Sequence, residues 1–537
     1  MNRLPHVLWI LGGLLLIIAY FVNLGFFPLI ADEATRGLVA LEMDLSGNYW
    51  VPTTNGTYYY NKPPFFNWII IGLFKLFGRA DEGVMRIAAV VPLFLFAGTL
   101  FVWVRKHLNT ATAFLAAAAL LSFGRMLIYD AHLAHIDIFY SWITFQGFIV
   151  VYHFSQKGNW LALYTISYAL AAIAFLCKGL PTVLFQGFTL IGWFLVERKF
   201  WKLFSWQHVV GGLVFVVLVG GYFYHYANYN DPIGIFETLW DQSRQRTVAD
   251  KAWYESVLHL FTFPFEHLVH LLPWSLLIVF CFRKGFVKHL WQDRFTRFLV
   301  VTFGANIPVY WLSPETYPRY LFMLYPMVFI VFSHAWYRNS EGMPRLKKGF
   351  EILFLVVLSL VALASPALYF IPLEVENIGL EATVLVVGFI SVAFFYYKLQ
   401  GHRLALLFIA LGLVRLGFDW VVLPQRFATS DWAEYREGAI EASRLSLNGP
   451  LHLYNGASLN HYATFYIERE RGEVLDLLRP QDAPDSYFIV YHTLAQDSAF
   501  EELYTFRIRY ENRTMKLVKY EDFELGKPAD LKSRLPE

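Results

Sequence analysis

Two adjacent carboxylates are the first side chains in this sequence that could do chemistry. Asp32 and Glu33 follow directly after the apolar stretch 7–30. Carboxylates at such a boundary are costly to desolvate and usually face a water-filled cavity, where they hold a cation or abstract a proton. The structural alternative has about equal weight: a helix begins here, Asp32 is its N-cap, and the helix dipole favours Glu33.

A lysine held among aromatic residues and prolines follows in the same loop. Tyr60 and Lys62 lie in the run Tyr58–Pro64, whose proline pair restricts the backbone. A lysine fixed in this way could point its charge at an anionic group. Taken alone, however, Lys62 is better explained as an interfacial lysine beside an aromatic belt.

A third group of polar residues precedes and enters another apolar run. Asp137 follows His132 and His135, and it is the residue of this group placed furthest into the apolar segment, so we expect it to point into a helical bundle. The two histidines have helical spacing and could ligate a metal together with Asp137. Two histidines alone are a weak metal motif, and we consider an ordinary polar role more frequent.

Two further cations lie at the ends of apolar runs. Lys178 precedes Gly179, which indicates either a tight turn or contact with an anion. Arg319 and Tyr320 follow Pro318, and Arg319 could clamp a phosphate with two hydrogen bonds. An ion pair between Arg319 and Glu315 is an equally good explanation.

The composition indicates which elements must position these residues. Of the 537 residues, 57% are hydrophobic and 16% are charged, and the mean hydropathy is +0.42. A water-soluble domain does not show this balance, so most of the chain must face lipid. No Walker loop, dinucleotide fingerprint or tandem repeat occurs, which argues against ATP-driven transport and gives no sign of nucleic-acid binding.

Apolar runs long enough to cross a bilayer predict about thirteen transmembrane helices. Their approximate centres are Leu16, Leu93, Ala117, Ile143, Ala169, Thr189, Val217, Leu277, Phe303, Phe329, Leu358, Val387 and Leu411. The basic clusters fall in alternate connections, so the positive-inside rule places them and the N-terminus in the cytoplasm and the C-terminus outside.

The fold class we predict is therefore an all-α polytopic membrane protein with a small C-terminal α/β domain outside the membrane. The membrane domain spans 1–424 and includes a first outer loop, 31–81, with amphipathic segments at Thr35–Leu45 and Phe65–Phe77. The soluble domain spans 425–537. Its expected strands are Leu451–Asn455, Tyr487–Tyr491, Phe506–Tyr510 and Lys516–Tyr520.

Taken in order, these motifs resemble one family. They are the Asp-Glu pair after the first span, Lys62-Pro63, Asp137, Lys178-Gly179, Leu272-Pro273-Trp274 and Pro318-Arg319-Tyr320. The set is similar to the dolichyl-phosphate-mannose-protein mannosyltransferase-like superfamily, and within it to the bacterial aminoarabinose transferases that modify lipid A. The resemblance covers roughly the first 425 residues, and the order and common face of the motifs make it specific.

The resemblance implies a GT-C fold and an enzyme of the bacterial inner membrane. Such an enzyme takes a sugar from a polyprenyl-phosphate carrier and passes it to lipid A, a glycan or a protein at the periplasmic face. By position, Asp32 would activate the acceptor hydroxyl and Asp137 would be a second acidic site residue. The expected substrate-binding residues are Glu33, Arg36, Tyr60, Lys62, Lys178, Arg319 and Tyr320.

The sequence departs from the aminoarabinose transferases in two places. Those enzymes carry a glutamate before their Lys-Pro that helps to hold a metal, and here that position is Asn61. Arg36 also lies one residue further from Asp32 than the corresponding arginine. No cofactor is therefore certain, and a divalent metal ion remains open.

A transporter or flippase for a lipid-linked sugar is the alternative from another functional class. Transporters place ionisable residues near the membrane midplane on broken helices and often contain internal repeats. Here the charged motifs gather at one face and no repeat is visible, which favours the transferase.

Overall fold

The structure is a computed structural model that describes residues 4–245, 253–314, 316–371, 378–492, 500–508 and 513–520. It divides into two compact units. The helical unit consists of Met1–Phe27 and Tyr60–Thr429, and the α/β unit consists of Pro28–Tyr59 and Ser430–Glu537.

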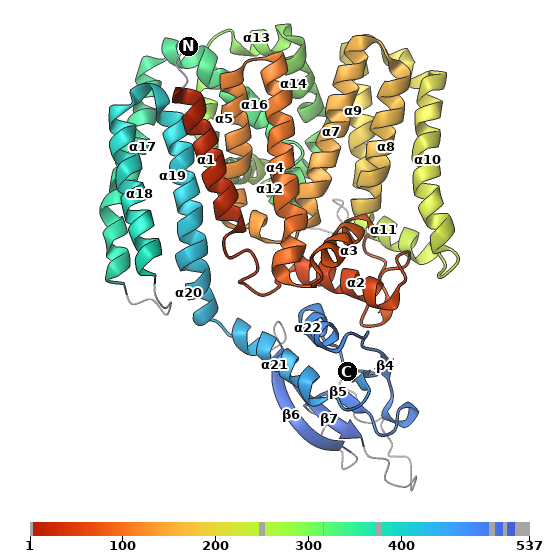
Figure 1. Ribbon diagram of the computed structural model, residues 1–537. Coiled ribbons are helices and arrows are strands. Elements are labelled where there is room, and N and C mark those ends of the chain that lie inside the picture. The colour runs from red at the N-terminus through yellow and green to blue at the C-terminus, as the bar shows by residue number, and fades with distance from the viewer. Residues whose placement is uncertain are drawn as a thin grey trace. The chain divides into compact units, whose positions relative to one another are not determined.

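The helical unit is built from apolar helices joined by short turns (Figure 1). Its longer helices are α1 Leu4–Phe21, α4 Glu82–His107, α5 Thr110–Ser122, α7 Ile136–Lys157, α8 Trp160–Lys178, α9 Pro181–Val196, α10 Trp206–Tyr226, α12 Trp253–His270, α14 Arg294–Asn306, α16 Tyr325–Asn339, α17 Pro344–Ala364, α18 Gly379–Lys398 and α19 Arg403–Gly417. Shorter helices and turns are α3 Phe65–Phe77, α6 Gly124–Ile128, η1 Asp130–His132, η2 Phe200–Phe204, α11 Ile233–Gln245, η4 Trp274–Phe282, α13 Phe286–Gln292, α15 Pro308–Trp311, η5 Pro318–Leu321, η6 Ser340–Gly342, η7 Ser365–Tyr369, η8 Gln400–His402, η9 Phe418–Val422 and α20 Leu423–Ala428.

Each of the thirteen predicted span centres lies within one of these helices. Among the described residues, six helices are long and apolar enough to cross a membrane, or up to eight if each of two bent pairs is a single span. Others, such as α9 with 16 residues, are shorter than a bilayer requires. A multi-pass membrane protein is confirmed, while thirteen crossings stay a prediction.

Neighbouring helices pack lengthwise within the helical unit. In Figure 1, α1 lies beside α19, and α8 lies between α7 and α10. Small residues permit close approach: a Cβ added at Gly412 of α19 would lie 2.8 Å from a side-chain carbon of Leu15 in α1. A larger side chain at this position would have to displace the Leu15 side chain.

Charged side chains inside the helical unit are matched by polar partners. Arg86 Nη1 donates to the carbonyl oxygens of Leu24 and Phe27, both at 2.8 Å. Arg415 Nε lies 2.7 Å from Asp419 Oδ2, and both side chains are about 1% exposed. Such pairing reduces the desolvation cost of charges in an apolar bundle.

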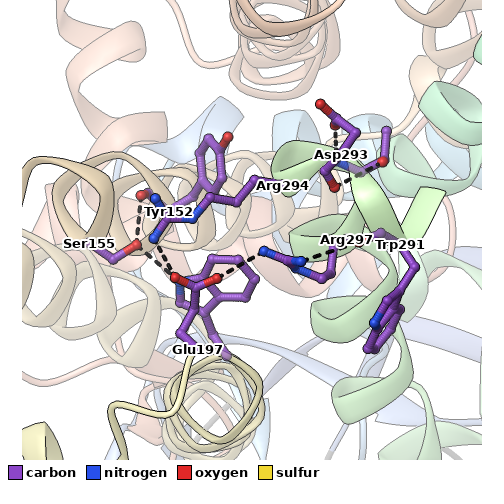
Figure 2. A network of polar contacts seen from close by, with 9 residues as sticks. Tyr152, Ser155, Glu197, Trp291, Asp293, Arg294 and Arg297 are labelled. Carbon is purple, nitrogen blue, oxygen red and sulfur yellow. Dashed lines mark hydrogen bonds and ion pairs between the residues drawn. The ribbon is translucent and has the colours of Figure 1, made fainter. Parts of the chain in front are cut away.

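A polar network joins the end of α9 to the start of α14 (Figure 2). The Glu197 carboxylate accepts hydrogen bonds from Arg294 and from Arg297, the latter at 3.2 Å. Asp293 begins α14 by accepting the Thr296 amide N–H at 2.8 Å. The network thereby joins the C-terminal end of α9 to the N-terminal end of α14.

The α/β unit contains a five-stranded mixed sheet with the order β4-β3-β5-β7-β6. Strand β3 runs parallel to β4 and β5, while β7 is antiparallel to β5 and β6. Its elements are α2 Asp32–Ser46, β1 Thr53–Thr54, β2 Thr57–Tyr58, α21 Trp432–Leu445, β3 Leu451–Tyr454, α22 His461–Arg471, β4 Leu477–Leu478, η10 Pro480–Asp482, β5 Tyr487–Tyr491, β6 Phe500–Ile508 and β7 Arg513–Tyr520. Each of the four expected strands overlaps an observed one, although β6 begins at Phe500 and residues 509–510 of the expected strand Phe506–Tyr510 lie outside the described residues. The short strands β1, β2 and β4 were not expected.

The first loop divides between the two units, whereas we expected 31–81 to belong with the membrane domain. Asn55 explains the difference, because its side chain donates to the Leu459 carbonyl at 3.2 Å and accepts from the Thr464 hydroxyl at 2.7 Å. Thr35 and His461 are joined by a further hydrogen bond of 2.8 Å. These contacts make Pro28–Tyr59 part of the α/β unit, whose second segment begins at Ser430 rather than at 425.

Candidate active site

Asp137 is the centre of a buried charged cluster in the helical unit. It lies in the first turn of α7 and is 4% exposed. The Lys178 ammonium donates to its Oδ1, and Arg319 Nε lies 3.4 Å from its Oδ2. The inward orientation expected for Asp137 is therefore confirmed.

Lys178 reaches this cluster from the C-terminal end of α8. Gly179 ends the helix with φ +80°, a left-handed conformation that a side chain disfavours. A Cβ at Gly179 would also lie 3.0 Å from a methyl carbon of Leu239. The tight turn expected at Lys178-Gly179 is present, and it directs the lysine toward Asp137 rather than away from the bundle.

Arg319 and Tyr320 are delivered by the short helix η5. Both are buried, at 9% and 8% exposure. The alternative partner for Arg319, Glu315, lies outside the described residues, so the structure does not test that pair. Arg319 forms an ion pair with Asp137, which is distant in sequence.

Aromatic rings surround the two cations. Lys178 Nζ lies 4.0 Å from the ring centroid of Tyr320 and 5.1 Å from that of Tyr140. The Arg319 guanidinium carbon lies 4.7 Å from the ring centroid of Tyr317. Rings at these distances attract cations electrostatically, so they help to hold both charges in an apolar environment.

Tyr140 and Tyr317 are site residues that we did not identify from the sequence. Tyr140 is three residues after Asp137 on the same helix, so helical spacing could have placed both on one face. Tyr317 directly precedes the Pro-Arg-Tyr motif. In both cases the tyrosine lies close in sequence to a predicted site residue, but aromatic residues are too frequent in this chain for that position to be distinctive.

Tyr60 is positioned by α11 and the end of α10. The Asn230 amide donates hydrogen bonds to the hydroxyls of Tyr60, at 3.2 Å, and Tyr226, at 2.9 Å. A Cβ at Gly234 would lie 3.1 Å from Cζ of Tyr60, so the ring packs directly on the α11 backbone. Lys62 follows in the same unit, half-buried and directly before the buried Pro63 and Pro64.

Asp32, Glu33 and Arg36 lie in the first two turns of α2, in the α/β unit. Ala31 is the N-cap and makes no side-chain cap, so the interpretation of Asp32 as N-cap is wrong: Asp32 is the first helical residue and is exposed. Glu33 is buried, and its Oε1 accepts the Ile30 amide N–H at 2.9 Å. Arg36 donates to the Tyr59 hydroxyl.

The histidines before Asp137 are buried but are not arranged as metal ligands. Among the residues that the structure describes, no group of three or more His, Cys, Asp or Glu side chains could hold a metal ion. His132 packs against Phe418 with a ring-centroid distance of 5.7 Å, and His135 Nδ1 lies 3.8 Å from Asp130 Oδ1. His132, His135 and Asp137 therefore do not form a metal-binding group in the described part of the chain.

Known proteins resemble this chain in sequence and in fold. A family model described as dolichyl-phosphate-mannose-protein mannosyltransferase matches residues 61–224. An uncharacterised Aquifex aeolicus protein is 24% identical over 471 residues, covering 84% of this chain and 85% of the relative. A Shewanella sediminis protein named undecaprenyl phosphate-alpha-4-amino-4-deoxy-L-arabinose arabinosyl transferase is 23% identical over 446 residues, covering 79% and 78%.

The crystal structure of ArnT from Cupriavidus metallidurans, bound to undecaprenyl phosphate, has a similar fold. Its TM-score is 0.67 at 19% sequence identity, and the match covers 95% of this chain and 97% of that one. Both units of the chain are thus accounted for by one known architecture. The resemblance seen in the motifs is confirmed: this chain is similar in sequence to the bacterial aminoarabinose transferases and shares the fold of ArnT.

Proposed function

We propose that this protein transfers a glycosyl group from a polyprenyl-phosphate-linked donor to an acceptor at the periplasmic face of the bacterial inner membrane. The observation that supports this proposal most strongly is the buried cluster of Asp137, Lys178 and Arg319. Two cations of the kinds that bind phosphate in proteins lie beside a single carboxylate in this cluster. The cluster is therefore suited to a second anion, and a phosphate meets that demand.

The names of the relatives support the same donor chemistry. One is named for an undecaprenyl-phosphate sugar donor, and the solved structure contains undecaprenyl phosphate. The family model is named for a dolichyl-phosphate sugar donor. A lipid-linked phosphate is common to all three, whereas the named sugars differ.

The proposed reaction is a displacement at the anomeric carbon. An oxygen of the acceptor forms a bond to that carbon while the bond from the carbon to the phosphate oxygen breaks. The electron pair of the broken bond stays on the phosphate, and the proton of the acceptor hydroxyl passes to the Asp32 carboxylate. Attack opposite the leaving group inverts the anomeric centre and releases polyprenyl phosphate.

Each side chain has a distinct role in this proposal. Lys62, Lys178 and Arg319 stabilise the negative charge that develops on the leaving phosphate. Asp137 holds Lys178 and Arg319 in position through its two oxygens. Tyr60 and Tyr320 contribute to donor binding in the helical unit. The resemblance assigns Glu33 and Arg36 of the α/β unit to substrate binding as well. The acceptor, whether lipid A, another glycan or a protein, is set by loop shape.

Complementation of a deletion strain tests the proposal. We expect Asp32→Asn and Lys178→Ala to reduce transfer by about a hundredfold or more, the usual effect of removing one group that stabilises transition-state charge. Lys157→Ala is the matched control, because Lys157 is also the last residue of a long helix but is exposed. Mass spectrometry of lipid A and surface glycans measures the product, and immunoblotting measures the protein in membranes. Normal products in both site variants would overturn the proposal.

A further inference from the structure

A cavity with charged and aromatic lining residues lies at the end of the helical unit that carries basic loops. It has a volume of about 410 Å³, within the roughly 300–1,000 Å³ typical of small-molecule sites. Residues of α1, α5, α16, η6, α17, η8 and α19 line it. Helix α5 begins at this cavity and ends shortly before Asp137 in sequence, so the cavity and the Asp137 cluster lie at opposite ends of the bundle.

The cavity combines buried aromatic walls with both signs of charge. Trp9, Trp336 and Phe350 line it and are each 7% exposed. Arg403 pairs there with Glu351, and both side chains are 14% exposed. Lys347 and Glu341 form a second pair nearer the surface, at 29% and 82% exposure. The formal charges of these four side chains sum to zero.

Several features favour a phosphate on one side of this cavity. Arg403 donates Nη1 to Glu351 and Nε to the Tyr396 carbonyl at 3.2 Å, which uses two of its five N–H groups. The first turns of α5, α17 and α19 contribute lining residues. Helix N-termini carry partial positive charge and favour anions, so they add to Arg403 and Lys347.

The remaining groups favour a cation beside that phosphate. Glu341 and Glu351 supply carboxylates, and indole rings attract ammonium groups through their faces. A purely anionic head group has no positive charge to place beside these two carboxylates. A zwitterionic head group can place its phosphate beside Arg403 and Lys347 and its ammonium group beside the carboxylates. We infer that the cavity binds the phosphoethanolamine head group of a membrane phospholipid, with the aromatic walls covering its glycerol and proximal acyl carbons.

The position of the cavity agrees with a lipid source. The positive-inside rule assigns the helix ends that carry Lys347, Lys348 and Arg403 to the cytoplasmic leaflet. A phospholipid bound there would be held between α1, α5, α16, α17 and α19. It would thereby stabilise the packing of helices of which only α16 and α17 are consecutive in sequence.

Native mass spectrometry of the delipidated full chain in detergent tests this inference. We expect phosphatidylethanolamine to bind more tightly than phosphatidylglycerol with the same acyl chains. Lys347→Ala should weaken that binding by about threefold or more, as expected for loss of one partly exposed charge interaction. Lys348→Ala is the matched control, since Lys348 neighbours Lys347 in α17 but does not line the cavity.

A charge change provides a second, independent readout. Glu341→Gln combined with Glu351→Gln removes both carboxylates, so the preference should shift toward phosphatidylglycerol. Equal binding of the two lipids by the unmodified protein, or equal losses in the Lys347 and Lys348 variants, would overturn the inference. If glycerophosphoethanolamine, which lacks acyl chains, bound as tightly as the lipid, a soluble ligand would replace the membrane source.

Discussion

Asp137 shows how a single buried carboxylate can organise cations from distant segments. Removing a carboxylate from a buried ion pair leaves the partner charge in an apolar environment, which costs about 3–5 kcal/mol. We therefore predict that Asp137→Asn lowers the thermal unfolding temperature of the detergent-solubilised protein as well as its activity. Differential scanning fluorimetry measures the first effect.

A second substitution separates ion-pair loss from general disruption of the site. Adding Lys178→Met to Asp137→Asn removes the isolated charge and keeps an apolar chain of similar length. The double variant should regain part of the lost stability without regaining activity. If the unfolding temperature of the double variant lay below that of the unmodified protein by the sum of the two single-variant effects, the two side chains would not be energetically coupled.

Glu42 and Glu468 form a buried carboxyl pair in the α/β unit. Burial raises the pKa of Glu42 from 4.5 to about 7, and burial together with the nearby Glu42 charge raises the pKa of Glu468 well above its usual range. Glu42 accepts the amide N–H groups of Asn55 and Gly56, and Glu468 accepts that of Leu475. The pair thus joins α2 and α22 across sequence-distant segments.

The raised pKa of Glu42 predicts how stability depends on pH. Its protonated form is favoured in the folded state, so this contribution is fully present below pH 4.5 and is lost as pH rises through about 7. The change is about 3 kcal/mol for Glu42, from 1.36 kcal/mol per pKa unit. Unfolding temperatures of the α/β unit measured between pH 5 and 8 should fall with increasing pH.

Substitution by glutamine identifies the group responsible. Glu42→Gln should flatten the decline, because a neutral side chain at this position no longer titrates or repels Glu468. Glu437→Gln, an exposed position on α21, is the control and should leave the pH dependence unchanged. An unaltered slope in Glu42→Gln would contradict the assignment.

At the scale of elements, α11 serves as a support for the loop that carries Tyr60 and Lys62. Gly234→Ala would place a methyl group 3.1 Å from Cζ of Tyr60, closer than ordinary contact, so the ring must move. We predict a several-fold loss of glycosyl transfer with little change in the amount of folded protein. Initial rates in membranes, normalised to protein, measure this effect.

Another glycine provides the control for helix propensity. Gly221 lies in α10, where an added Cβ would meet no atom within 4 Å, so Gly221→Ala tests the extra methyl group without a clash. Its transfer rate should match that of the unmodified protein. If Gly234→Ala and Gly221→Ala were equally active, contact between Tyr60 and α11 would not matter for the reaction.

At the scale of the whole molecule, the α/β unit depends on a segment from the other end of the sequence. Leu29 donates its amide N–H to the Tyr466 hydroxyl at 3.2 Å, and Thr464 donates to Asn55. We predict that Ser430–Glu537 expressed alone lacks a cooperative unfolding transition, since the partners of these buried polar groups are absent. Joining Pro28–Tyr59 to it through a flexible linker should restore the transition.

Circular dichroism during thermal unfolding distinguishes these outcomes. A cooperative transition in Ser430–Glu537 alone, at the same temperature as in the joined protein, would show that the first loop adds nothing to its stability. The comparison needs no assumption about catalysis, and it therefore tests the division of the chain independently of the proposed function.

The sequence alone determined the local features of this protein, because hydrophobic periodicity, helix punctuation and strand alternation depend on neighbouring residues. All thirteen helix centres, the amphipathic helix Phe65–Phe77 and strand Tyr487–Tyr491 were predicted in this way. The ordered motifs also indicated Asp137, Lys178 and Arg319 as site residues, although no local rule joined them.

Only the tertiary structure decided which charges meet and which segments share a core. Arg319 pairs with Asp137, a choice that nearby Glu315 obscured in the sequence, and Lys178 reaches the same carboxylate from another helix. Likewise, Pro28–Tyr59 belongs with Ser430–Glu537 because polar groups such as the half-buried Asn55 and the buried Glu42 require partners. Burial makes these long-range pairings necessary, but the identity of each partner depends on how the helices and strands are brought together in space.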